Sequence, residues 1–200
     1  MIEPGSFEVP AGAVQCVTRG DWRAWLAENW PQPEGVWLVT FKRSAGDLYL
    51  PYEDAVEEAL CFGWVDSKPR ALDEHRTMLW FAPRKPGSLW SRPNKERVAR
   101  LIVSGQMHAS GMAKVEAAQR DGTWEALDAV EDLVIPPDLQ AALNDFPAAA
   151  SNFGQFPRSA RRGILEWILQ AKTPITRERR VLETARLAEQ NIRANQWKRP

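Results

Sequence analysis

Residues 80–94, WFAPRKPGSLWSRPN, place the tightest constraint on how this chain can fold. Pro83, Pro86 and Pro93, with Gly87 between them, exclude both a regular helix and the interior of a regular strand. The same segment holds two tryptophans, one phenylalanine and three positive charges. We therefore expect an ordered loop at which strand-like sequence gives way to helical sequence.

Before this loop, short helical and strand patterns alternate. Residues 18–30 carry an apolar stripe at helical spacing and start at Thr18, a good N-cap residue. Residues 35–43 alternate as a strand, SAGD predicts a turn, and LYLPY is compatible with a short return strand. Residues 52–63 predict a second helix, and residues 64–84 predict a β-hairpin.

After Pro93 the periodicity is helical to the end of the chain. The segment RRGILEWILQ has a strongly apolar stripe, from which we expect Trp167 to lie in the core. The order of patterns predicts an α+β fold: a small antiparallel sheet with helices in the N-terminal part, followed by an all-helical C-terminal part. We expect two domains, an α+β domain over residues 1–124 that includes the Trp/Arg-rich loop, and a helical region over residues 125–200.

Charge is balanced overall and unevenly distributed. The chain has 26 Lys/Arg and 26 Asp/Glu, but residues 84–120 hold 8 basic and 2 acidic residues, and residues 121–156 hold 0 basic and 7 acidic residues. We expect acidic and basic blocks to face one another in the fold, and the carboxylates of the second helix to pair with the 84–120 block. The alternative is that a basic block binds an anion. A pI near 6.8 argues against a dedicated nucleic-acid binder.

Motifs of the common enzyme classes are absent. The chain has no GxSxG, GxxxxGK[ST], GxGxxG or HExxH pattern and only two histidines, so we expect no metal site and no cofactor. Cys16 and Cys61 form no disulfide framework or CxxC pair, and Cys61 at a helix C-terminus is expected to be a buried apolar residue. The N-terminal residues lack a signal-peptide pattern and no apolar run is long enough to span a membrane, so we expect a cytoplasmic protein.

Asp66 is the one candidate for a catalytic residue. It follows Trp64 directly after the break at Gly63, where a carboxylate could cap a turn, pair with an arginine or serve as an acid or base. Structural pairing is the commoner fate of such a carboxylate. We therefore assign no catalytic residue and keep Asp66 as a candidate.

The Trp/Arg loop and the helix start that follows it form the candidate ligand-binding surface. Hydroxyl, amide and guanidinium groups would gather near a helix N-terminus, where backbone N–H groups favour an anion, and indole rings would offer faces for stacking. Alternatively, the tryptophans fill the core between the sheet and the helices. The candidate ligand-binding residues are Trp64, Asp66, Trp80, Arg84, Ser88, Trp90, Ser91, Arg92, Asn94 and Arg97.

A second basic cluster lies near the C-terminus, in SARRG and TRERRV. On helices with clear apolar stripes, such charges are usually solvated or paired with the chain's own acids. The alternative is a surface for phosphate or an acidic partner. The cluster comprises Arg158, Arg161, Arg162, Lys172, Arg177, Arg179 and Arg180.

Three quoted stretches give the chain a family resemblance. EEALCFGWVDS, FAPRKPGSLWSRPNKERVARLIVSGQMHASGMAKVEAAQRDGTW and SARRGILEWILQAKTPITRERRV resemble the bacterial YdeI/OmpD-associated, bacteriocin-protection family, over roughly residues 52–124 and 145–195. The chain departs from the family pattern at Ser67, where the pattern has glycine, and at the inserted TPI. The resemblance implies a soluble bacterial protein linked to bacteriocin or envelope stress. It supplies no reaction, so no active site is carried over.

Three functional hypotheses follow. The first is a non-enzymatic stress or protection protein that binds a small anionic ligand or a protein partner through the Trp/Arg surface. The second is an enzyme that uses Asp66 with Arg84 and a serine in an aromatic cleft. The third is a nucleic-acid-binding module that uses the basic blocks. We expect the first rather than the others.

Overall fold

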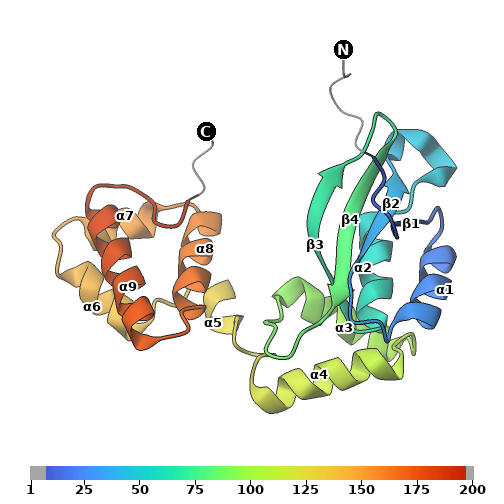
Figure 1. Ribbon diagram of the computed structural model, residues 1–200. Helices are drawn as coiled ribbons and strands as arrows, with labels where there is room; N and C mark the ends of the chain where they lie inside the picture. Colours follow the sequence, from blue (N-terminus) through green and yellow to red (C-terminus); the bar gives the residue numbers. More distant parts are fainter. Residues whose placement is uncertain (1–7, 197–200) are drawn as a thin grey trace. The chain divides into compact units, whose positions relative to one another are not determined.

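The computed structural model describes residues 8–196, and the chain divides into two compact units, Met1–Glu125 and Ala126–Pro200 (Figure 1). The N-terminal unit combines a four-stranded sheet with helices, and the C-terminal unit is helical, which confirms the α+β prediction. The N-terminal elements are β1 (Val14–Gln15), α1 (Arg19–Asn29), β2 (Val36–Phe41), the 3-10 helix η1 (Arg43–Leu48), α2 (Tyr52–Cys61), β3 (Trp64–Ala71), β4 (Arg76–Pro83), α3 (Arg92–Val103) and α4 (Ala109–Asp121).

The sheet has the strand order β1-β2-β4-β3. The β3–β4 hairpin and the β2–β4 pairing are antiparallel as expected, whereas β1, which the sequence did not reveal, pairs parallel with β2. The expected return strand in LYLPY is wrong. Both edges of β2 are occupied by β1 and β4, so residues 48–52 have no free edge to pair with, and Leu50 instead turns into the core.

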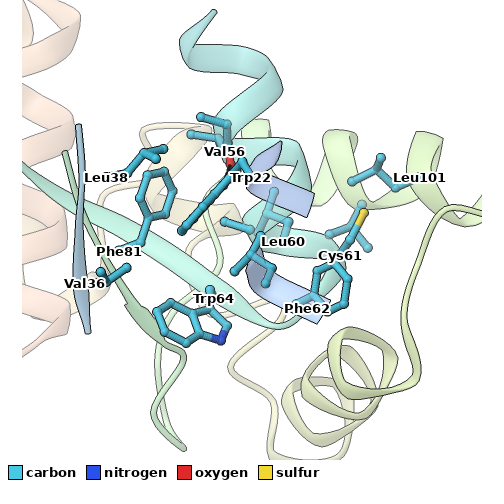
Figure 2. Close-up of a cluster of buried hydrophobic side chains, with 14 of the residues drawn as sticks. Trp22, Val36, Leu38, Val56, Leu60, Cys61, Phe62, Trp64, Phe81 and Leu101 are labelled. Carbon is cyan, nitrogen blue, oxygen red and sulfur yellow. Dashed lines mark hydrogen bonds between the residues drawn. The ribbon is translucent and has the colours of Figure 1, made fainter. Parts of the chain in front are cut away.

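Helices α1 and α2 cover one face of the sheet (Figure 1). Residues paired directly opposite one another on adjacent strands share a face, and Val36 of β2 faces the helices together with Phe81 of β4. Figure 2 shows the ring of Phe81 beside that of Trp22 of α1, and Val36 of β2 and Leu60 of α2 belong to the same buried cluster. This apolar layer fixes the helices against the sheet and thereby sets the position of α2 relative to β3.

The acidic face of α2 is neutralised from two helices. Arg97 and Arg100 of α3 bind Glu53 and Glu57, as the charge pattern predicted. The sequence did not reveal that α1 supplies the rest: Arg19 binds Asp54, Glu57 and Glu58, and Arg23 binds Glu58. Glu58 is buried as a result, because two guanidinium groups replace the water it loses.

The start of α4 rests against the end of α2. The backbone N–H of His108 donates to the carbonyl oxygen of Cys61 at 3.1 Å, and the Ser110 hydroxyl donates to the carbonyl oxygen of Phe62 at 3.0 Å. Gly111 completes the contact: a Cβ atom at this position would lie 2.1 Å from the Cys61 carbonyl oxygen. The close approach of these two helices therefore requires a residue without a side chain.

The C-terminal unit packs its helices around an apolar centre in which α9 contacts α6, α7 and α8. Thr173 caps α9 and Pro174 follows at its first position, a common start for a helix. Trp167 is half-buried rather than in the core, because Ile164, Leu165 and Ile168 take the inward face of α8. The helices are α5 (Asp128–Glu131), α6 (Pro137–Asn144), α7 (Ala149–Gln155), α8 (Arg158–Leu169) and α9 (Pro174–Glu189).

Candidate ligand-binding site

A pocket of about 400 Å³ lies in the N-terminal unit between the sheet and the start of α2. Its volume falls in the range of roughly 300–1,000 Å³ that is typical of small-molecule sites. Aliphatic side chains form most of its wall, and hydroxyl groups and one carboxylate supply the polar atoms. The lining residues are Leu38, Thr40, Tyr49, Leu50, Tyr52, Ala55, Asp66, Ser67, Pro69, Thr77, Met78 and Leu79.

Strand β3 departs from regular pairing where it lines the pocket. Asp66 pairs with Phe81 of β4 and Pro69 pairs with Leu79, so β3 carries one extra residue between them, a β-bulge. A bulge redirects side chains and bends the strand locally. The bulge also accommodates Pro69, because β3 is an edge strand of the sheet and a proline there breaks no interior ladder. The bulge thus turns Asp66, Ser67 and Pro69 towards the pocket.

A hydrogen bond joins the two polar residues at the pocket wall. The Tyr52 hydroxyl donates to Oδ2 of Asp66 at 2.9 Å. Tyr52 occupies the first position of α2, so the helix start is tied directly to the strand. Burial and this hydrogen bond raise the pKa of Tyr52 to about 12, while Arg97 opposes the shift. At neutral pH the side chain of Tyr52 is therefore a protonated phenol.

The Tyr52 pKa leads to a prediction for alkaline pH. The folded state holds the phenol proton more tightly than the unfolded state, whose tyrosines ionise near pH 10. The contribution of this pair to stability should therefore be intact below about pH 10 and decline as the pH rises towards 12. An absorbance titration of phenolate should show a late step that is missing in Tyr52→Phe. A step near pH 10 that disappears in Tyr52→Phe would contradict this assignment.

The structure separates the aromatic candidates from Asp66. Trp64 and Trp90 are almost completely buried in the core of the N-terminal unit, so they present no ring face to a ligand. Trp80 is half-buried, pairs with Trp37 of β2, and meets its ring at 5.3 Å in an edge-on arrangement on the sheet face away from the helices. Of the candidate tryptophans, none lines the pocket that contains Asp66.

Arg84 lies in a second, much smaller cavity formed by the loop and α4. Its side chain stacks on the Trp90 ring at 3.7 Å, and Nη1 donates to the carbonyl oxygen of Leu89 at 3.1 Å. Nε is buried without a hydrogen-bond partner in the described part of the chain, and burial lowers the pKa of Arg84 to about 10. The cavity, which Ser88 also lines, measures about 20 Å³, enough for roughly one water molecule.

The remaining candidates lie at the start of α3. Ser91 is its N-cap and Arg92 its first residue, and both are half-buried. Arg97 donates to both carboxylate oxygens of Glu53, at 2.8 and 2.9 Å, and to the side-chain oxygen of Asn94. The guanidinium group of Arg97 is thus already engaged by the protein, and it ties α3 to α2.

Two arginines of the second basic cluster form ion pairs with acids of their own unit, and two others bind backbone carbonyl oxygens. Arg162 binds Glu131 and Glu166, and Arg177 binds Asp138. Arg158 donates to the carbonyl oxygen of Glu131, and Arg180 donates to that of Trp167. These contacts agree with the expectation that acidic and basic blocks face one another.

Other site chemistries find little support in the described residues. No group of three or more His, Cys, Asp or Glu residues between residues 8 and 196 is arranged to hold a metal ion. Cys16 and Cys61 are both buried, and burial raises the pKa of each thiol, to about 11 for Cys16. Over the same residues, no helix has both the length and the apolar character needed to cross a membrane.

Sequence reasoning found Asp66 and missed its surroundings. Tyr49 was assigned to a short return strand. Tyr52 was included both in that strand and at the start of the second helix, where the structure has it. Thr40 and Thr77 are ordinary strand residues, and they share a pocket only because β2 and β4 pair in the register that sets them opposite each other. Proline at position 51 marks a helix start and correctly placed Tyr52 in the first turn, but nothing in the sequence indicated its contact with Asp66.

The fold and the pocket together define a two-unit α+β protein whose N-terminal unit carries a cavity of small-molecule size. This chain belongs to the family described as Domain of unknown function (DUF8412), whose model matches residues 14–114. Residues 132–191 match the model described as Bacteriocin-protection, YdeI or OmpD-Associated, which confirms that family resemblance for the C-terminal unit. Searches of curated proteins and of solved structures gave no match.

Proposed function

We propose that the protein binds a small molecule in the pocket between the sheet and α2. The observation that carries this proposal is the combination of an apolar cavity of about 400 Å³ with the Asp66–Tyr52 pair on its wall. Apolar lining with a few fixed polar groups is the usual composition of ligand sites, since burial supplies affinity and the polar groups fix orientation. The match of the C-terminal unit to the bacteriocin-protection family supports a role of this binding in bacterial protection against bacteriocins.

An anionic ligand on the Trp/Arg segment has less support. Arg84 is 4 % exposed beside a water-sized cavity, and Arg97 is bound by Glu53. An enzyme built from Asp66, Arg84 and a serine also has less support, because Asp66 lines one cavity while Arg84 and Ser88 line another. A nucleic-acid-binding module also has less support, because arginines that form ion pairs within the chain offer little free charge to a nucleic acid.

A thermal-shift screen of metabolites and cell-wall fragments tests the binding proposal. A ligand that binds only the folded state raises the melting temperature, by a stabilisation of about 2.7 kcal/mol at a hundred times its Kd. Ser67 lines the pocket and is exposed, so Ser67→Trp should block the entrance without disturbing the core. Lys68 is its exposed neighbour outside the lining, which makes Lys68→Trp the matched control. Hits should lose their effect in Ser67→Trp and keep it in Lys68→Trp.

Two results would contradict the proposal. One is a screen in which no compound raises the melting temperature of the parent chain. The other is a set of hits whose effects are equal in the two tryptophan variants, because binding would then lie elsewhere.

We also propose that residues 1–124 and 125–200 are separate domains. The division of the chain into Met1–Glu125 and Ala126–Pro200 supports this boundary. Each segment expressed alone should give a helical circular dichroism spectrum and a cooperative thermal transition. A segment that is soluble only when joined to the other would argue for a single domain.

A further inference from the structure

We infer that the ligand of this pocket is an organic cation, with an ammonium group beside Asp66 and an apolar body against the sheet. This inference rests on the proposed function and adds the chemical class of the ligand. It departs from the anionic ligand that the Trp/Arg segment suggested, because that segment and this pocket are different places in the fold.

The charge of the pocket wall favours a cationic ligand. Among the lining residues, Asp66 alone has an acidic side chain and none has a basic one; the others are aliphatic, hydroxyl-bearing or phenolic. The pocket surface therefore carries one negative charge and no positive one. A ligand with a complementary positive charge gains from this field, whereas an anion is repelled.

The Asp66 carboxylate has unused capacity as a hydrogen-bond acceptor. Its one hydrogen bond within the described residues comes from Tyr52 and ends on Oδ2, and no ion pair reaches it there. A carboxylate can accept about four hydrogen bonds. Oδ1 of Asp66 thus has acceptor capacity left for a donor on the ligand.

Arg84 and Arg97, which act electrostatically on the Asp66–Tyr52 pair, do not neutralise Asp66. Arg84 interacts with it electrostatically but forms no ion pair with it, and its guanidinium group stacks on Trp90. Arg97 acts on Tyr52 electrostatically, yet its donors are held by Glu53. A cation from outside the protein is the partner that the geometry leaves room for.

Two aromatic rings in the pocket wall also favour a cation. Tyr49 and Tyr52 both line the pocket, and the faces of phenol rings attract ammonium groups more than neutral groups of the same size. Leu38, Leu50 and Leu79 supply apolar surface for the rest of the ligand. An ammonium group on an apolar skeleton fits both parts of the wall.

A matched series of probes tests this inference on the full chain. Benzylamine, benzyl alcohol and benzoate share one skeleton and differ in charge, and each is titrated at pH 7 while protein amide resonances are followed by NMR. One charge-assisted hydrogen bond should make benzylamine bind about tenfold more tightly than benzyl alcohol. Benzoate should bind more weakly than both, and the perturbed amides should include those of Tyr52 and Asp66.

Variants separate charge from shape. Asp66→Asn should weaken benzylamine about tenfold and leave benzyl alcohol within about twofold. Asp47→Asn removes an exposed carboxylate from neighbouring η1, outside the lining, and should change neither affinity. Tyr52→Phe keeps both the aromatic ring and the Asp66 carboxylate, so it should still bind benzylamine more tightly than benzyl alcohol. This variant tests the inference even if Asp66→Asn is poorly folded.

The outcomes distinguish the inference from the function on which it rests. Pocket binding of all three probes with equal affinity overturns the cationic class and leaves the binding proposal standing. Tighter binding of benzoate does the same. Absence of binding by all three probes in the parent chain counts against both.

Discussion

Alanine at position 111 is expected to destabilise the N-terminal unit by about 3 kcal/mol or more. Its Cβ would lie 2.1 Å from the Cys61 carbonyl oxygen and 2.8 Å from that of Leu60. Both atoms belong to the backbone of α2, so no side-chain rotation can relieve the overlap. Helix α4 would have to move away, which would lengthen the hydrogen bond from the Ser110 hydroxyl to Phe62.

Urea unfolding followed by tryptophan fluorescence measures this effect, because eight of the ten tryptophans precede residue 125. Gly20→Ala is the control, since Gly20 lies in α1 and a Cβ there would meet only the Thr18 hydroxyl oxygen at 3.8 Å. That variant should change stability by no more than about 1 kcal/mol, in the stabilising direction because alanine favours helix. Equal stability of the two variants would refute the close packing of α4 on α2.

Replacing Trp22 by alanine is the second large effect, expected to cost about 3–5 kcal/mol. The side chain is 0 % exposed, and its ring centroid lies 5.2 Å from those of both Trp25 and Phe81. Its Nε1 donates to the carbonyl oxygen of Ala55 at 3.0 Å, which joins α1 to α2. Trp22→Phe keeps most of the apolar volume and loses this bond, so it should cost less than Trp22→Ala.

Trp167→Ala provides the comparison in the C-terminal unit. Trp167 is only half-buried, with the guanidinium group of Arg180 4.9 Å from its ring centroid. Its removal leaves a surface depression that water can fill and not a closed cavity. We therefore expect the free energy of unfolding to fall by about 1–2 kcal/mol. Denaturation monitored by far-ultraviolet circular dichroism gives this value. A cost as large as that of Trp22→Ala would show that Trp167 is a core residue after all.

Signals that act within a few residues were predicted well from the sequence. Thr18 and Asp21 form a capping box at the start of α1, and Thr173 caps α9. Gly63 and Gly122 follow α2 and α4 with positive φ angles of 79°, a conformation in which glycine has no side chain to clash. These features depend on neighbours in the chain, so their residue types indicate the structure directly.

Features that depend on distant segments were not predictable in the same way. The burial of Glu58 requires Arg19 and Arg23, which lie more than thirty positions earlier, and nothing in the α2 sequence names its partner. The local sequence around Trp64 and Trp90 does not distinguish these buried tryptophans from tryptophans on the surface. Only the assembled sheet and helices decide which indole rings they enclose.

The candidate site shows the same division. Asp66 was singled out because it follows Trp64 directly after the break at Gly63, where a carboxylate could cap a turn, pair with an arginine or serve as an acid or base. Its hydrogen bond with Tyr52 arises from the packing of α2 on β3, and the pocket arises from a bulge that no local sequence pattern marks. The chemistry of one residue was therefore visible, while the cavity that gives it a possible use was not.

The bulged outer strand has a consequence for association with other proteins. Lys68, Pro69 and Arg70 are exposed along β3, and the opposite margin of the sheet is the two-residue β1. Charged residues, a proline and an irregular backbone discourage strand addition at an edge, and a very short strand offers little to extend. Both edges of the sheet therefore disfavour the strand addition that leads to amyloid-like stacking. We expect a binding partner to contact side chains of the protein and not to add a strand to its sheet.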